Sequence, residues 1–99
     1  MYSILIVEDE PIIRKGIASL VDFESLGIST VQEAENGEQA LTMIQEHTPD
    51  ILLTDINMPK IDGITLAQLA RAEFPQLRII FLTGYDYVDY LLSAVKLGV

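Results

Sequence analysis

The chain has 99 residues, 49% of them hydrophobic, so it can form one small domain with a packed core and is too apolar to be disordered. The absence of cysteine excludes disulfides and thiolate metal sites, and a formal net charge of −9 disfavours direct contact with nucleic-acid phosphates. Neither a membrane-spanning apolar run nor a signal peptide is expected, so we predict a cytoplasmic protein.

The first half of the chain predicts two strand-helix units. Residues 3–7 are apolar and branched, which is typical of a strand, and Pro11 is suited to the first turn of a helix. Residues 22–27 interrupt that helix, and residues 28–33 predict an edge strand because Val31 lies among polar neighbours. The apolar residues at helical spacing in the first helix are Ile13, Ile17, Leu20 and Val21.

The second half repeats the pattern. A turn over residues 35–38 opens a second helix, and residues 50–54 form a mostly apolar run that predicts a strand buried on both faces. Asp62 is the predicted cap of a third helix that ends before Pro75, and residues 78–82 predict a fourth strand. Residues expected to face inward on the second and third helices are Ala40, Leu41 and Ile44, and some of Ile64, Leu66, Ala67, Leu69 and Ala70. A fourth helix is expected from the stripe Val88, Leu91, Leu92 and Val95.

Four strand-helix units with short connections predict an α/β fold, a doubly wound parallel sheet with helices on both faces and right-handed crossovers. Such a sheet binds ligands beyond the carboxyl ends of its strands, at the point where the winding reverses. Strands one and three are neighbours at that point, so the polar residues that follow them are expected to meet.

Acidic residues follow both of those strands. Glu8 and Asp9 come after strand one, Asp55 after strand three, and the hydroxyl of Thr83 after strand four. Carboxylates at close range raise one another's pKa, and a divalent cation relieves that conflict. Mg²⁺ prefers oxygen ligands in octahedral geometry. We therefore expect Asp9 and Asp55 as direct ligands, the backbone carbonyl of Asn57 as another, and Glu8 through water.

Taken singly, each of these residues has a simpler interpretation. A carboxylate after a strand is usually a turn former or a helix cap, and a lone threonine is usually a capping hydroxyl. Glu10 and Asp62 are interpreted as a first-turn acid and a cap, and His47 as a surface residue that complements a helix dipole. Tyrosines expected to pack rather than to stack on bases are Tyr85, Tyr87 and Tyr90. The hypothesis of a site depends on the conjunction of these residues at one edge.

With these motifs the sequence resembles the receiver domain of two-component response regulators. The matching segments are residues 5–11, 33–41, 49–59, 62–63 and 80–84. Residues 22–27 and 84–88 resemble more narrowly the receivers that precede AraC-type DNA-binding domains.

The resemblance implies a flavodoxin-like sheet with strand order 2-1-3-4-5 and transfer of a phosphoryl group from a sensor histidine kinase to Asp55. It implies a role for Asp9 as a Mg²⁺ ligand and for Glu8 as its acidic companion. It also implies that the hydroxyl of Thr83 contacts the phosphoryl group and repositions the loop after strand four. Phosphorylation would thereby switch a transcriptional output. We expect a signalling domain rather than a turnover enzyme.

The sequence departs from the family at its end. Receivers continue with a fifth strand, a Lys that pairs with the phosphoryl group and a fifth helix, and Lys96 is not a substitute for that Lys. We therefore interpret residues 1–99 as a receiver that is incomplete at its C-terminus, with strand order 2-1-3-4. The exposed edge of strand four predicts marginal stability or a homodimer.

Two alternatives belong to other functional classes. A phosphorylation-independent dimerisation or interaction module would share the fold but not the phosphoryl transfer. An aspartyl phosphatase is disfavoured because the residue two positions after Asp55 is Asn57 rather than a second aspartate. A nucleotide-binding enzyme is disfavoured because the turn after the first strand carries acids where a phosphate-binding loop carries glycines.

Overall fold

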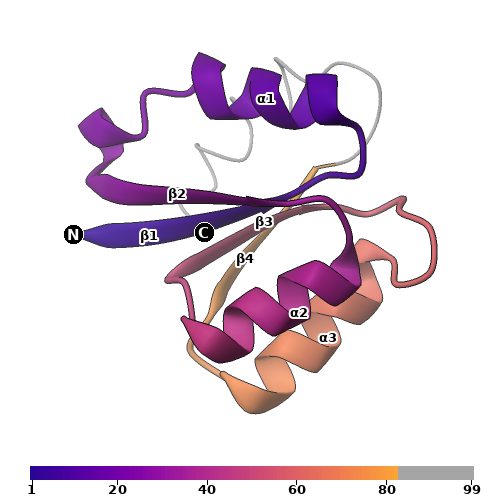
Figure 1. Ribbon diagram of the computed structural model, residues 1–99. Coiled ribbons are helices and arrows are strands. Elements are labelled where there is room, and N and C mark those ends of the chain that lie inside the picture. The colour runs from indigo at the N-terminus through magenta and orange to yellow at the C-terminus, as the bar shows by residue number, and fades with distance from the viewer. Residues whose placement is uncertain (83–99) are drawn as a thin grey trace.

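The computed structural model describes residues 1–82, which form four strands, three α-helices and one 3₁₀ helix (Figure 1). In chain order the elements are β1 Tyr2–Val7, α1 Pro11–Leu20, the 3₁₀ helix η1 Glu24–Leu26, β2 Ile28–Ala34, α2 Gly37–Glu46, β3 Ile51–Asp55, α3 Gly63–Glu73 and β4 Arg78–Leu82. Every predicted strand and helix within these residues is present, with boundaries shifted by a residue or two.

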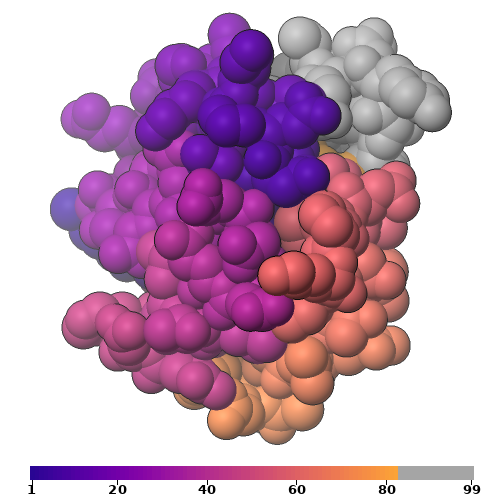
Figure 2. Space-filling model, turned by 45° about the vertical axis from the view of Figure 1, so that its right-hand side comes forward, coloured from indigo at the N-terminus to yellow at the C-terminus, as the bar shows by residue number. Residues whose placement is uncertain are grey.

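The four strands make one sheet in the order β2-β1-β3-β4, and every neighbouring pair is parallel. Helix α1 lies on one face of the sheet and α2 and α3 on the other (Figure 1). Figure 2 shows α2 and α3 side by side beneath the segment that carries α1. The predicted doubly wound fold and its strand order are confirmed, and the turns after β1 and β3 therefore lie next to each other.

Strand β1 divides the core into two halves because its successive side chains point to opposite faces. Ile4 and Ile6 pack with Ile17 of α1, whereas Leu5 and Val7 pack with residues of α2 and α3. These four side chains are almost completely buried, whereas Tyr2 at the start of the strand is exposed. A strand buried on both faces holds its last residue, and the turn that follows, in a fixed position.

Local capping explains where two of the helices begin. Asn36 accepts a hydrogen bond from the Gln39 backbone amide at 2.8 Å, and Asp62 accepts one from the Thr65 amide at 2.7 Å. Each cap satisfies an amide that has no partner within its own helix. The predicted capping role of Asp62 is thus confirmed.

Some details differ from the predictions. Leu20, the last residue of helix α1, is 69% exposed, because the buried positions of this helix are those of Arg14 and Ile17. Glu10 is the N-cap residue, without a side-chain cap bond, rather than a first-turn acid. Of the α3 candidates, those that are buried are Leu66, Ala67 and Ala70, whereas Ile64 and Leu69 are exposed.

The predicted fourth helix, Thr83 and the three tyrosines lie outside the described residues. Among residues 1–82, no helix combines the length and the apolar character needed to cross a membrane.

Candidate functional site

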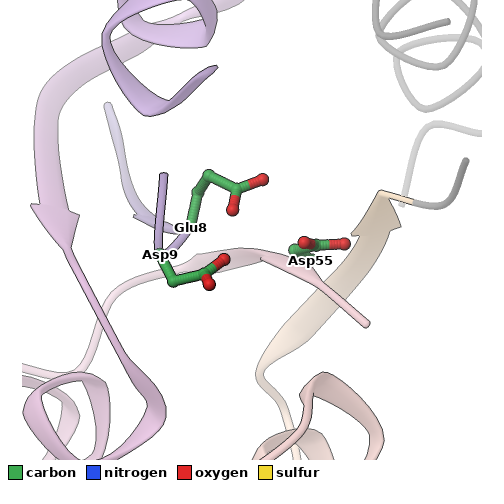
Figure 3. A group of neighbouring side chains, drawn as sticks. All are labelled: Glu8, Asp9 and Asp55. Atoms are coloured by element: carbon green, nitrogen blue, oxygen red, sulfur yellow. The ribbon is translucent and has the colours of Figure 1, made fainter. Parts of the chain in front are cut away.

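Three carboxylates meet at the carboxyl edge of the sheet. Glu8 and Asp9 belong to the turn after β1, and Asp55 is the last residue of β3. One carboxylate oxygen from each residue lies within 4.8 Å of the others. Figure 3 shows the side chains of Glu8 and Asp9 extending toward the side on which Asp55 lies. Parallel pairing of Val7 with Thr54 produces this convergence, since it aligns the ends of β1 and β3.

Glu8 is the most deeply placed of the three, with 1% of its surface exposed. The Glu10 backbone amide donates to its Oε2 at 3.2 Å, while its Oε1 is buried without a hydrogen-bond partner among residues 1–82. Burial, together with the neighbouring Asp9 and Asp55 carboxylates, raises the pKa of Glu8 to about 8. A buried carboxylate oxygen without a partner is costly and calls for a proton or a cation.

Asp55 is partly exposed and therefore open to a reaction partner. Burial raises the pKa of its carboxyl group, while hydrogen bonds from the backbone amides of Asn57 and Ile56 oppose that rise. The carboxylate thus lies where amide dipoles favour negative charge and where Asp9 disfavours it. A cation would resolve this opposition in favour of the ionised form.

The loop after Asp55 is held by close backbone contacts. The Gly63 amide donates to the Ile56 carbonyl at 2.9 Å, and a Cβ at Gly63 would overlap the Asp55 carbonyl oxygen. A Cβ at Gly37 would lie 2.8 Å from Cβ of Ile61, so the start of α2 packs on the same loop. Both glycines let a helix N-terminus approach the loop that carries Asp55.

The donor set fits a hard divalent cation. Three carboxyl groups offer oxygen ligands, and the unpartnered Oε1 of Glu8 is a buried acceptor that a cation or its bound water could satisfy. Within the part of the chain that the structure describes, no lysine or arginine forms an ion pair with any of the three. The charge of the cluster is therefore available to a bound ion.

The structure brings Glu8, Asp9 and Asp55 together, as their positions after β1 and β3 led us to expect. Asn57 lies two residues after Asp55, with an exposed side chain, and Thr83 lies outside the described residues.

Sequence reasoning missed Arg14. This residue is only 9% exposed, and its Nη1 donates to the Glu8 carbonyl at 2.8 Å. Its Nε pairs with Oε1 of Glu33 at 3.1 Å. One signal was available: Arg14 stands three residues before Ile17, on the inward stripe of a helix where an apolar residue is the usual choice.

Comparison with known proteins agrees with this fold. Residues 4–99 match the response regulator receiver domain family. The chain is 39% identical over 99 residues to the uncharacterized transcriptional regulatory protein YesN of Bacillus subtilis, covering all of this chain and 27% of that protein. It is 31% identical over 96 residues to the transcriptional regulatory protein HptR of Staphylococcus aureus, covering 97% of this chain and 37% of that one.

Solved structures lead to the same family. The REC domain of AraT, a response regulator from Geobacillus stearothermophilus, superposes with a TM-score of 0.79 at 41% identity, over 97% of this chain and 74% of that one. A two component transcriptional regulator AraC from Clostridium phytofermentans gives a TM-score of 0.82 at 34% identity, with the same coverage. The chain spans only 27% and 37% of the lengths of these two curated relatives, YesN and HptR. It belongs to the family of response regulator receiver domains.

Proposed function

We propose that Asp55 accepts a phosphoryl group from a phosphohistidine on a sensor histidine kinase, with Mg²⁺ bound beside it. The observation that carries this proposal is the convergence of the Glu8, Asp9 and Asp55 carboxylates at one edge of the sheet. In the proposed site Asp9 and Asp55 are direct ligands, the Asn57 carbonyl is a third, and Glu8 acts through water. The metal would neutralise the charge of the incoming phosphoryl oxygens.

The proposed chemistry asks little of the protein beyond positioning. An Asp55 carboxylate oxygen attacks phosphorus in line, the bond from phosphorus to the donor histidine nitrogen breaks, and an aspartyl phosphate results. The partly exposed position of Asp55 at a strand end allows a donor to approach. One transfer leaves the chain modified, which suits a signalling domain rather than a turnover enzyme.

We further propose that phosphorylation switches a transcriptional output in the cytoplasm. Transcriptional regulators recur among the relatives, and one structural neighbour is an AraC-type regulator. A phosphoryl group adds charge and acceptor oxygens that can bias a two-state element. In this proposal the Thr83 hydroxyl binds the new phosphoryl oxygens.

Intact mass measurement after incubation with acetyl phosphate and Mg²⁺ tests the assignment of Asp55. We expect the mass of one added phosphoryl group on the wild-type chain, and none on Asp55→Asn or when EDTA removes the metal. Asp50→Asn is the matched control, because Asp50 immediately precedes the same strand at its opposite end and hydrogen bonds the Ser3 amide at 2.8 Å. This control should be labelled like the wild type.

Two outcomes would contradict the proposal. Unmodified wild-type protein at saturating phosphodonor would favour the alternative of a phosphorylation-independent interaction module. Equal labelling of Asp55→Asn and the wild type would place the phosphoryl group on another residue.

We also propose self-association through the edge of β4. Among residues 1–82, this strand pairs with β3 alone, and Phe81 and Arg78 are exposed on it. An edge strand with free backbone groups can pair with a second copy. Sedimentation across a hundredfold range of concentration should show a dimer; a monomer throughout would count against this interface.

A further inference from the structure

We infer that Arg14 is a positioning residue for the acidic site: by bridging the Glu8 carbonyl and the Glu33 carboxylate, it fixes the turn from which Glu8 and Asp9 reach Asp55. This inference rests on the proposed Mg²⁺ site and goes beyond it. Among residues 1–82, the Arg14 side chain hydrogen bonds the Glu33 carboxylate and the Glu8 carbonyl, and none of the three carboxylates of the site. It acts through the backbone of Glu8.

The backbone of Glu8 is anchored on both sides. Its amide donates to the Ala34 carbonyl of β2 at 3.2 Å, and its carbonyl accepts from Nη1 of Arg14 at 2.8 Å. The sheet ladder between β1 and β2 ends at the pair Val7 and Ala34, so the Glu8 carbonyl lies beyond it. Without Arg14 this buried carbonyl would lose its donor.

Glu33 holds the guanidinium in place from β2. Its Oε1 lies 3.1 Å from Nε of Arg14, and both side chains are largely withdrawn from solvent. The planar guanidinium can donate in two fixed directions at once, here toward a carboxylate on β2 and a carbonyl after β1. The bridge therefore ties α1, β2 and the turn after β1 to one another.

The burial of Arg14 argues for a specific role. An apolar residue of similar size would fill this inward position of α1 without the cost of taking a charge out of water. What an apolar residue could not supply is a donor for the Glu8 carbonyl. Since Glu8 also presents a buried carboxylate to the site, any rotation of this turn would move Glu8 and Asp9 relative to Asp55.

Lys15 provides a matched control within the same cluster. It also pairs with Glu33, at 3.3 Å, but its side chain is 70% exposed and no hydrogen bond joins it to the turn. Lys15→Met and Arg14→Met remove the same charge from the neighbourhood of the same glutamate. Only Arg14→Met removes the bridge.

Isothermal titration of the full chain with MgCl₂ measures the effect on the site. We expect Arg14→Met to raise the Kd for Mg²⁺ about tenfold, the lower end of the range for residues that orient metal ligands. Lys15→Met should change it by less than about twofold, because exposed charges are screened. Arg14→Lys should resemble Arg14→Met, since one ammonium group does not reproduce the planar fork.

Amide hydrogen exchange in metal-free protein supplies a second readout. The Glu10 amide, which donates to Oε2 of Glu8, should exchange about tenfold faster in Arg14→Met and Arg14→Lys relative to core amides such as that of Leu5. It should be unchanged in Lys15→Met. This ratio separates loosening of the turn from general loss of stability.

The outcomes distinguish this inference from the proposed function. A wild-type chain that binds no Mg²⁺ contradicts the proposed metal site, and the exchange ratio then decides the role of Arg14 alone. The inference would be overturned if Arg14→Lys kept the wild-type Kd for Mg²⁺ and the wild-type exchange rate of the Glu10 amide. Equal effects of Arg14→Met and Lys15→Met would also overturn it. If Arg14→Met does not fold, Arg14→Lys carries the test.

Discussion

The two turns that bring the carboxylates together are held in different ways. The turn after β1 is held by a side chain, because the Arg14 guanidinium donates to the Glu8 carbonyl. The loop after β3 is held by backbone packing, because Gly63 lies against the Asp55 carbonyl and Asp62 caps the following helix. A charged side chain from α1 positions one half of the site, and close backbone contact at a glycine positions the other.

The difference predicts which changes each turn tolerates. Removing the guanidinium donor should loosen the turn after β1 and leave the sheet intact. A loop held by glycine contact has no slack for an added atom, since close-packed interiors transmit such strain to their neighbours. Substitutions in the two turns should therefore differ in the size of their effects on stability.

Gly63→Ala should destabilise the chain by about 3 kcal/mol, because its Cβ would overlap the Asp55 carbonyl and lie 2.9 Å from Cα of Ile56. Urea denaturation measures the free energy of unfolding. Gly16→Ala is the control, since nothing lies within 4 Å of a Cβ at that position in α1. There the substitution should stabilise by about 0.5–1 kcal/mol. Equal effects at the two sites would refute the steric account of the loop.

The pH dependence of stability should report on Glu8. Its pKa is raised from 4.5 to about 8 in the folded chain. Between these two pH values the folded state therefore holds a proton that the unfolded state has released. The associated stability is complete below pH 4.5 and is lost as the pH rises through about 8. Thermal melting of metal-free protein should therefore show a falling Tm from pH 5 to pH 8.5.

Glu8→Gln should remove most of this slope and raise the stability at pH 8.5 by at least about 1.4 kcal/mol, the value of one pKa unit. Glu10→Gln, in the same turn but exposed, should leave the slope unchanged. Saturating Mg²⁺ should flatten the slope in the wild type, since the cation takes the place of the proton. A Tm that is independent of pH in metal-free wild type would contradict this assignment.

Asp62→Ala should cost about 1 kcal/mol, the usual value of a lost N-cap, because the Thr65 amide loses its acceptor. The pKa of Asp62 is lowered by the same hydrogen bond. Asp62→Asn retains a capping oxygen and should lie close to the wild type in urea denaturation. If both variants lose equal stability, charge at the helix terminus rather than the cap is the cause.

Lys60→Gly should give the smallest effect and the opposite sign. Lys60 has φ of 67°, a left-handed conformation that costs a side-chain residue about 1–2 kcal/mol. After the entropic cost of glycine, a gain of about 0.5–1 kcal/mol should remain in urea denaturation. Lys60→Ala retains the strain and also removes the weak 4.0 Å pair with Glu38, so it should show no gain.

Much of the fold was predictable because its signals are local. The apolar run before Asp55 predicts a strand buried on both faces, and the structure buries Leu52 and Leu53 completely or nearly so. Asp62 was predictable as a cap because a side-chain oxygen before a helix has one common use. Leu20 has the helical spacing of an inward residue and yet is exposed, because helical spacing alone does not show where the helix ends.

The candidate site was predictable in its members but not in its support. Glu8 and Asp9 follow β1 and Asp55 ends β3, and a parallel sheet must align these strand ends, so topology alone implies that the three residues converge. The bridge from Arg14 to Glu33 joins residues 19 apart in the chain. No local pattern pairs them, because their contact depends on how α1 lies over β2.

The sequence by itself determined the order of the elements, the burial of the strands and the edge at which the acids lie. Those properties follow from apolar periodicity and from the geometry of parallel sheets. Only the tertiary structure decided that Glu8 is buried with one unpartnered oxygen, that Arg14 anchors its carbonyl, and that Gly63 lies against Asp55. Each of these depends on atoms brought together from separate elements, and burial, hydrogen bonding and close contact are properties of that packing.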